Sequence, residues 1–218
     1  MTGPPAARAA RLVLATANAH KLAELTRILR AGRTEVELMS LAEFAGAPDV
    51  AETGATFAEN ALLKARAIAD FAGLPAVADD SGLCADALNG MPGVLSARWS
   101  GKHGDDAANL RLVLEQLADV PDDRRGAQFA CAAALVLPDG RERIAEGIVR
   151  GTLIRASRGH NGFGYDPIFV PDAEELAIAG LSTGSMTTAE MDSADKDKIS
   201  HRGKALRSLA PVIAALLG

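Results

Sequence analysis

Residues 75–82, Pro75-Ala76-Val77-Ala78-Asp79-Asp80-Ser81-Gly82, join a short apolar run to two adjacent carboxylates. The apolar run, from Leu74 to Ala78, is typical of a buried strand, and the serine and glycine after the acids are typical of a tight turn. Open α/β sheets bind ligands where strands end, and paired aspartates suit a cation with oxygen ligands, such as Mg²⁺. The alternative is an Asx-type turn that carries two solvated acids.

The length and composition of the chain are those of an ordinary globular protein. Its 218 residues suffice for one good-sized core, or for one domain with an attached lobe. The formal net charge of −5 argues against a nucleic-acid scaffold, because such proteins concentrate basic surface. An anionic small molecule is still a suitable ligand, since it needs only a few local cations.

The cysteines and the N-terminal residues bear on the compartment. Cys84 and Cys131 lie far apart and show no metal-ligand spacing, which favours two reduced thiols in a reducing cytosol. No apolar stretch approaches the roughly 20 residues of a membrane span. Residues 1–10 lack the apolar segment of a signal peptide, so we expect a disordered leader there and a cytoplasmic protein.

A strand, a small polar turn and a helix are expected near the start of the chain. Residues 11–15 suit a strand, and apolar residues follow at helical spacing from Leu22, with Asn18 as a plausible cap. A helix N-terminus presents free backbone N–H groups and a partial positive charge, which suits a phosphate. Lys21 would lie in the first helical turn, where a cation is favourable only with an anion beside it.

The next segments predict a strand at Glu35–Leu41 and a helix from about Thr53 to Phe71, ended by a glycine and a proline. Lys64 projects close to the apolar stripe of this helix, one turn after Asn60. A charge on such a face is costly unless it is paired. Two interpretations are open: a lysine that snorkels at the edge of the stripe, or a phosphate-binding cation that faces the Asp79–Asp80 turn.

The rest of the chain predicts a helix at Asp105–Leu117 and two antiparallel strands, Ala127–Leu137 and Arg143–Ile154, joined by a Pro-Asp-Gly turn. This pair breaks the strand–helix alternation and suggests a second lobe or a sheet extension. Gly159–Val170 is rich in glycine and aromatic residues, which lets the backbone approach a ligand and gives it rings to lie against. A final helix follows Ser200, which is a possible cap.

Six short motifs occur in a fixed order along the chain. They are Thr16-x-Asn18-x-x-Lys21, Glu52-Thr53-Gly54 with Glu59-Asn60-Ala61, Ala78-Asp79-Asp80-Ser81-Gly82-Leu83, Pro92-Gly93-Val94-x-Ser96-Ala97-Arg98, Gly162-Phe163-Gly164-Tyr165-Asp166-Pro167 and Ser200-His201-Arg202-Gly203. In this order they closely resemble the inosine/xanthosine triphosphate pyrophosphatase family. The resemblance covers the chain from about Leu12 to its C-terminus.

The resemblance implies an elongated, two-lobed α/β fold over residues 11–218, with a central twisted mixed sheet flanked by helices and an active-site cleft between the lobes. It also implies a homodimer. The implied reaction is Mg²⁺-dependent hydrolysis of ITP, dITP and XTP to the monophosphate and pyrophosphate, which would clear deaminated purines from the nucleotide pool.

The resemblance also implies a role for each matching residue. Asp80 would be the catalytic carboxylate and, with Glu52, a metal ligand. The triphosphate would be held by Lys64, with Asn60 beside it, and by the turn Thr16, Ala17, Asn18, Ala19, His20 and Lys21, while Ser81 would touch the substrate. The base would be framed by Phe163, Gly164, Tyr165, Asp166, Lys196, His201 and Arg202. Lys198 is the alternative to Lys196, because the preceding stretch matches no pattern.

Two other functions are considered. A related enzyme class hydrolyses modified pyrimidine triphosphates, and the base-side motifs at 162–166 and 201–202 argue against it. A module that binds a nucleotide without hydrolysing it is disfavoured by the two adjacent acids, which repel phosphates unless a metal intervenes. A membrane or a nucleic-acid polymer is not an expected partner.

Overall fold

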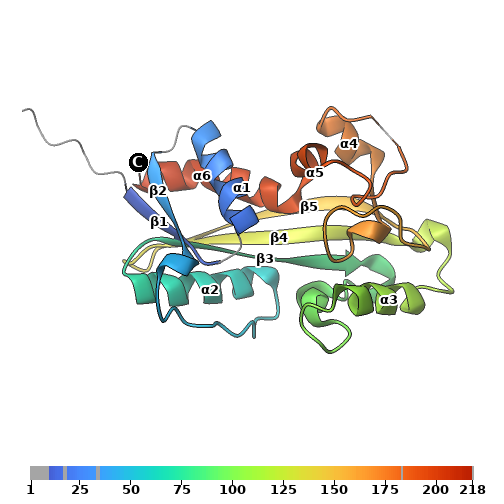
Figure 1. Cartoon of the computed structure of the whole chain (residues 1–218), viewed down its shortest axis with the longest axis horizontal. Coiled ribbons are helices and arrows are strands. Elements are labelled where there is room, and N and C mark those ends of the chain that lie inside the picture. Colours follow the sequence, from blue (N-terminus) through green and yellow to red (C-terminus); the bar gives the residue numbers. More distant parts are fainter. Residues whose placement is uncertain (1–9, 17–18, 33–34, 183, 218) are drawn as a thin grey trace, which may run out of the picture.

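The computed structural model describes residues 10–16, 19–32, 35–182 and 184–217, without the side chains of residues 19 and 20. Its framework is a six-stranded mixed sheet in the order β2-β1-β3-β4-β5-β6 (Figure 1). Strand β1 is parallel to both of its neighbours, whereas the other pairs are antiparallel. The strands are β1 (Ala10–Leu14), β2 (Val36–Ser40), β3 (Ala76–Ala85), β4 (Gly126–Val136), β5 (Glu142–Leu153) and β6 (Phe169–Pro171).

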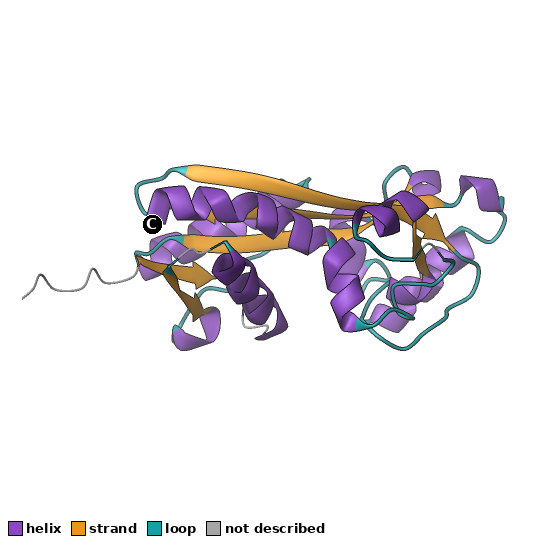
Figure 2. Ribbon diagram, turned by 90° about the horizontal axis from the view of Figure 1, so that it is seen from above, coloured by secondary structure: helices purple, strands orange, loops and turns teal. Residues whose placement is uncertain are grey.

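Helices cover both faces of this sheet. In Figure 1, α1 (Ala19–Ala31) and α6 (His201–Leu217) lie on one side of the long strands, and α2 (Phe57–Ala72) lies on the other. Figure 2 shows an elongated molecule whose helices gather toward the two ends of the long strands. The remaining helices are α3 (Asp106–Gln116), α4 (Ala173–Ile178) and α5 (Ser193–Ile199), with short 3₁₀ segments at 41–43, 86–88, 93–98 (η3), 122–124 and 166–168.

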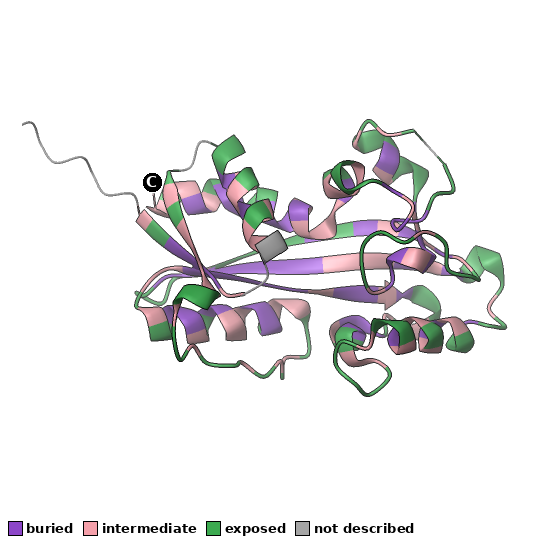
Figure 3. Cartoon of the chain, in the orientation of Figure 1, coloured by how far each residue is buried: buried purple, intermediate pink, exposed green. Residues whose placement is uncertain are grey.

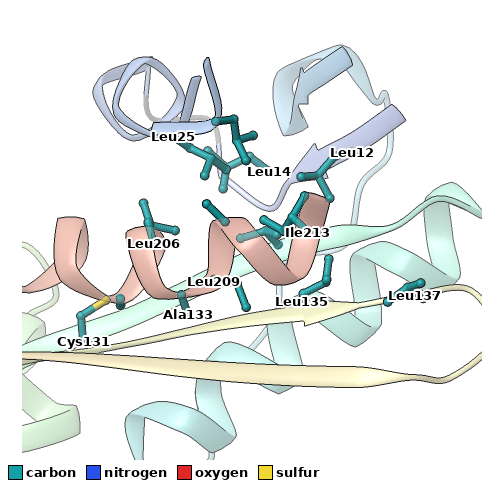
Figure 4. Close-up of a cluster of buried hydrophobic side chains, with 14 residues drawn as sticks. Leu12, Leu14, Leu25, Cys131, Ala133, Leu135, Leu137, Leu206, Leu209 and Ile213 are labelled. Atoms are coloured by element: carbon teal, nitrogen blue, oxygen red, sulfur yellow. The ribbon is translucent and has the colours of Figure 1, made fainter. Parts of the chain in front are cut away.

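Successive side chains of β3 point to opposite faces of the sheet. Val77 packs with α1 and α6 in one apolar cluster, whereas Ala76 and Ala78 pack against α2 in another. Figure 4 shows the first cluster, with Leu209 and Ile213 of α6 placed between β4 and the β1–α1 segment. The long strands are therefore buried over much of their length, and exposed residues lie mostly on the outer helices and loops (Figure 3).

A third apolar cluster occupies the other end of the long strands. It includes Leu83 of β3, Val113 of α3 and Phe169 of β6. Residues 79–82 of β3 belong to none of these clusters. The expected elongated, two-lobed α/β fold is confirmed, and its two lobes correspond to apolar cores that share one continuous sheet. The polar segment of β3 lies between these cores.

The elements agree with the expected ones except at the start of α2, near the acidic pair and after residue 168, where β6, α4 and α5 were not expected. The expected tight turn at residues 79–82 is wrong, because β3 continues through this segment to Ala85. Helix α2 begins at Phe57 rather than near Thr53, and Thr56 caps it by accepting a hydrogen bond from the Glu59 N–H. The antiparallel pair joined by a turn is confirmed as β4 and β5, which extend the same sheet.

The expected leader at residues 1–10 falls outside the described residues except for Ala10, which begins β1. The expected cap Asn18 also lies outside them. Among the described residues, no helix is both long enough and apolar enough to cross a membrane.

Candidate active site

The two adjacent aspartates lie in the middle of a strand, so they face opposite sides of the sheet. Asp79 points to the side of α1 and α6, and Asp80 points to the side of α2. In the register of β3 with β4 both lie opposite alanines, Ala133 and Ala132, whose small side chains leave room for partners from the helices. The two carboxylates therefore have different partners and do not form one paired cation site.

Asp80 is held by two side chains of helix α2. The Asn60 Nδ2 donates to Asp80 Oδ2 at 3.0 Å, and the Lys64 Nζ donates to Asp80 Oδ1 at 3.3 Å. The amide oxygen of Asn60 accepts from the Gly54 N–H at 2.8 Å, so this fully buried side chain is engaged at both ends. Asn60 thus joins the loop before α2 to the carboxylate, and it orients Asp80 in this structure.

Lys64 also reaches a second carboxylate. Its Nζ lies 2.8 Å from Glu52 Oε1, and Arg98 Nη1 of η3 lies 3.2 Å from the other oxygen of Glu52. Lys64 is therefore paired with two acids, which rules out the interpretation of a lysine that snorkels to solvent. The lysine does face Asp80, as the functional interpretation expects.

The pKa values of the two carboxyls on the α2 side move in opposite directions. Burial raises the pKa of Asp80, and the nearby Lys64 and Asn60 offset this effect only in part. Burial also opposes ionisation of Glu52, but hydrogen bonds and charge from Lys64 and Arg98 outweigh it and lower the pKa of Glu52. The charged form is thus more strongly favoured at Glu52 than at Asp80.

Glu52 and Asp80 fit a magnesium ion as a pair of oxygen ligands. The Lys64 ammonium lies within hydrogen-bond distance of both carboxylates, so both are directed toward the same position. Among the described residues no set of three or more His, Cys, Asp or Glu side chains forms a metal site. Mg²⁺ is commonly held by one or two carboxylates, with waters and substrate phosphates as its other ligands.

A pocket of about 450 Å³ opens beside these residues. Its wall combines the residue after β1, the loop at 48–52, helix α2, and the end of η3 with the segment that follows it. The residues that line it include Asp49, Glu52, Lys64, Arg98 and His103. Lys64 and Arg98 thus bring positive charge, and Asp49 and Glu52 negative charge, to a space large enough for phosphate groups.

The site on the other face is built around Asp79. Lys21 Nζ lies 2.8 Å from Asp79 Oδ2, and Arg202 Nε lies 3.0 Å from the same oxygen. Arg202 Nη2 also lies 3.4 Å from Ser81 Oγ. Burial disfavours the charged carboxylate, but the two cations overcome it and hold the pKa of Asp79 far below its usual range.

The glycine-rich segment 159–170 forms a loop that is anchored from several directions. The Gly164 N–H donates to Asp106 Oδ2 at 2.9 Å, and the buried Tyr165 hydroxyl donates to Ser96 O at 2.8 Å. Phe163 is 67% exposed, so its ring is available to a ligand, whereas Tyr165 faces the core.

Asp166 connects this loop to α5. Its Oδ2 accepts from the Phe163 N–H at 2.8 Å and from Lys196 Nζ, and its Oδ1 accepts from the Thr188 hydroxyl at 2.8 Å. Lys196 Nζ also lies 5.3 Å from the centroid of the Phe163 ring. Lys198 instead pairs with Asp195 on the exposed side of α5, so the structure brings Lys196, not Lys198, to the loop.

His201 begins α6 and is half-buried. Its ring stacks on Phe129 with centroids 5.1 Å apart and an interplanar angle of 14°. Burial, together with the nearby positive charge of Arg202, lowers the pKa of His201 to about 3. The imidazole is therefore neutral at physiological pH and offers one hydrogen-bond donor and one acceptor.

The first predicted phosphate segment is described only in part. Ala17 and Asn18 lie outside the described residues, as do the side chains of Ala19 and His20. The Thr16 carbonyl accepts from the Leu41 N–H at 3.3 Å, which ties the end of β1 to the segment after β2. Of this segment, Lys21 is the residue whose side-chain contacts are known.

A model of the Ham1 family matches residues 12–212 of the chain. The chain belongs to the Ham1 family. It is 56% identical over 208 residues to a dITP/XTP pyrophosphatase of Streptomyces coelicolor, covering 95% of this chain and 99% of the relative. It is also 56% identical over 209 residues to a dITP/XTP pyrophosphatase of Corynebacterium efficiens, covering 95% and 99%. The resemblance found in the six motifs is thus confirmed.

Two solved structures of Ham1 relatives match the fold. A nucleoside-triphosphatase, or dITP/XTP pyrophosphatase, from Mycobacterium abscessus has a TM-score of 0.74 and 52% identity, over 93% of this chain and 98% of that one. A HAM1 protein from Coxiella burnetii has a TM-score of 0.83 and 43% identity, over 94% and 99%.

Sequence reasoning assigned no role to several side chains that shape this Ham1 site. Arg98 and Ser96 belong to a motif that was recognised, but only the fold shows that Arg98 reaches Glu52 and that Ser96 O anchors Tyr165. Thr188 lies in a stretch that matched no pattern, and no local signal could have linked it to Asp166. Asp79 was considered only as half of a paired cation site with Asp80, whereas it pairs with Lys21 and Arg202.

Proposed function

We propose that this Ham1 family protein is an Mg²⁺-dependent pyrophosphohydrolase that converts ITP, dITP and XTP to their monophosphates and pyrophosphate. The dITP/XTP pyrophosphatases to which it is 56% identical support this substrate class. The observation that carries the proposal is the convergence of Glu52 and Asp80 on the Lys64 ammonium, beside a pocket that Lys64 and Arg98 line.

Glu52 and Asp80 would hold the magnesium ion. When bound, the ion neutralises phosphate oxygens and makes pyrophosphate a better leaving group. Lys64 and Lys21 would add charge-assisted hydrogen bonds to the phosphates, worth about 1.5–3 kcal/mol each. Catalysis of this reaction depends mainly on such positioning and charge stabilisation.

Asp80 is the group best suited to handle the attacking water. Burial raises its pKa, which brings a carboxylate closer to the proton affinity of a general base. The water oxygen bonds to phosphorus, its proton passes to Asp80, and the bond to the leaving phosphate oxygen breaks. Asn60 holds the carboxylate in place through its amide nitrogen during this step.

The purine would lie against Phe163, between the anchored loop and the start of α6. Hypoxanthine and xanthine carry an oxygen at the 6-position, where adenine carries an amino group. Lys196 and Arg202 are donors without acceptor capacity, and they would bind that oxygen while rejecting the amino group. Guanine shares the 6-oxo group, so its rejection would depend on its 2-amino group.

The cellular setting belongs to the same proposal. The enzyme would act in the cytoplasm as a homodimer and remove deaminated purines from the nucleotide pool. Free cysteines at 84 and 131 suit a reducing compartment. Light scattering of the purified protein would test the dimer, for which the expected mass is twice the 22.5 kDa of one chain.

Kinetics on a nucleotide panel tests the activity. The kcat/KM for ITP, XTP, dUTP, GTP and ATP is measured by pyrophosphate release, with Mg²⁺ and with chelator. We expect ITP and XTP to exceed ATP by about 10⁴-fold, since an unpaired polar group can discriminate on that scale. Equal rates for ITP and ATP would refute the substrate class, and a preference for dUTP would favour the pyrimidine alternative.

A further inference from the structure

We propose that Asp79 is a positioning residue that orients Lys21 and Arg202 together, and so links the phosphate-binding and base-binding parts of the site. This inference rests on the proposed function. Asp79 would touch neither substrate nor metal, and would act through the two cations that it holds.

A single carboxylate oxygen receives both cations. Lys21 comes from the first turn of α1 and Arg202 from the first turn of α6, and both donate to Asp79 Oδ2, at 2.8 and 3.0 Å. The Asp79 side chain is 4% exposed, whereas those of Lys21 and Arg202 are 24% and 12% exposed. The carboxylate is thus covered by the cations, which retain some surface for a ligand.

The cations around Asp79 keep donors for a ligand. Lys21 and Arg202 each lie in the first turn of a helix whose N-terminus is electropositive. Glu24 of α1 lies close enough to interact with both Asp79 and Arg202, so two carboxylates face two cations, and burial raises the pKa of Glu24. Asp79 Oδ2 takes one donor from each cation, and the exposed parts of Lys21 and Arg202 can donate to an anionic ligand.

Stability alone is a weak explanation for this arrangement. A buried ion pair is often no more stable than well-packed apolar residues of similar size. At the preceding inward position of the same face, Val77 packs with α1 and α6 in the apolar cluster. A carboxylate at position 79 is better explained by the orientation of Lys21 and Arg202, which lie 58 and 123 residues from it in the sequence.

Loss of the Asp79 charge should disturb both parts of the site at once. In Asp79→Asn the side-chain shape is kept, but Lys21 and Arg202 repel each other without an intervening anion. Small displacements of positioning groups cost about 10²-fold in rate, and we expect a loss of this size in kcat/KM for ITP. Asp86→Asn makes the same change at an exposed, surface-paired carboxylate just after β3 and should leave kcat/KM unchanged.

Binding of substrate fragments separates positioning from a general structural effect. Tripolyphosphate probes the Lys21 side and inosine monophosphate probes the Arg202 side, each by calorimetry. Asp79→Asn should weaken both, by about tenfold or more for each lost charge-assisted contact. In a Lys21→Ala background, Asp79→Asn should no longer weaken the binding of tripolyphosphate. In an Arg202→Ala background, it should no longer weaken the binding of the monophosphate.

Additive effects in these backgrounds would overturn the inference, because they would mean that Asp79 acts independently of its two partners. Normal fragment binding by Asp79→Asn would overturn it as well, while ITP hydrolysis by the unmodified enzyme would leave the proposed function standing. If Asp79→Asn does not fold, Asp79→Glu gives the test: it keeps the charge but moves the carboxylate, so it should fold and bind both fragments more weakly. Unchanged binding by Asp79→Glu would likewise contradict the inference.

Discussion

Asp79 and Asp80 show how one step along a strand can separate two chemical environments. Asp79 is saturated by two cations, and its pKa lies far below the usual range. Asp80 has an amide and a lysine as partners, and burial raises its pKa. The same residue type thus has a lowered pKa on one face of the sheet and a raised pKa on the other.

Replacement of Asp80 by asparagine tests its catalytic role. Asp80→Asn should lower kcat for ITP by about 10² or more, which is the effect of losing a positioned base or a charge contact. The fold should persist, because the amide oxygen introduced at position 80 can still accept a hydrogen bond from Asn60, and Lys64 still pairs with Glu52. Steady-state kinetics and thermal unfolding check both points. Turnover close to that of the unmodified enzyme would exclude Asp80 as the base.

His201 predicts a specific dependence of stability on pH. The folded pKa is about 3 and the unfolded pKa is about 6.5, so between these values the unfolded chain binds a proton that the folded chain does not. Stability should therefore fall as the pH is lowered below about 6.5, by at most about 1.4 kcal/mol per pH unit. This contribution is absent above the unfolded pKa, where both states are neutral.

The variant His201→Phe isolates this effect, since it keeps a ring against Phe129 and removes the titrating group. Urea unfolding at about pH 7 and about pH 5 should show a smaller loss of stability in the variant than in the unmodified protein. Carboxylates such as Asp79 titrate in both proteins, so their effect on stability cancels when the two proteins are compared. An equal loss in both proteins would show that the His201 ring titrates normally in the folded state.

The placement of helix α6 depends on a glycine of β5. A Cβ built on Gly147 would collide with the His201 carbonyl oxygen and would lie 2.6 Å from the Ala205 N, both of them backbone atoms. Gly147→Ala should therefore displace the start of α6 and destabilise the protein by about 1–3 kcal/mol. Because His201 and Arg202 move with the helix, KM for ITP should rise as well.

A matched substitution at Gly184 controls for the change to alanine, since no atom lies within 4 Å of its added Cβ and its backbone is not left-handed. Thermal unfolding and ITP kinetics on both variants give the comparison. If Gly147→Ala has the stability and KM of Gly184→Ala, then close packing at Gly147 does not position α6.

Local patterns predicted most elements of this fold, and they failed where distant partners decide the conformation. The apolar periodicity of α6 and the turn between β4 and β5 needed no tertiary information. The Asp-Asp-Ser-Gly segment looked like a turn, but it continues β3 because Lys21, Lys64 and Arg202 neutralise its acids from three helices. Helices α4 and α5 are too short for their periodicity to be visible in the sequence.

The candidate site follows the same division. Motif resemblance picked out Asp80, Glu52 and Lys64, which the structure brings into contact; their roles stay predictions. It could not predict that Asn60 forms a hydrogen bond with Asp80, nor that Asp79 pairs with two cations. These contacts join residues far apart in the sequence, and only the packing of helices on both faces of the sheet brings them together.

At the scale of the whole molecule, two apolar cores share three long strands, and the polar groups lie between the cores. The pocket with Glu52, Lys64 and Arg98 opens on the α2 face, and the loop with Phe163 and Asp166 lies toward the end that carries α3, α4 and α5. A nucleoside triphosphate would therefore contact both ends of the molecule, whereas a fragment of it would contact mainly one.

This arrangement predicts that substrate fragments protect different segments from hydrogen exchange. With Mg²⁺, tripolyphosphate should slow exchange at residues 48–52, which line the pocket, and should leave residues 162–166 unchanged. Inosine monophosphate should slow exchange at residues 162–166, because the Gly164 and Phe163 N–H groups belong to the loop that it would cover.

Mass spectrometry of peptic peptides measures both regions in one experiment. Residues 139–141, in the exposed turn between β4 and β5, neither line the pocket nor belong to the loop, and they give the internal control. Equal protection of the loop by tripolyphosphate and the monophosphate would contradict a divided site. Each fragment binds the folded protein and not its open states, so protection should increase with fragment concentration.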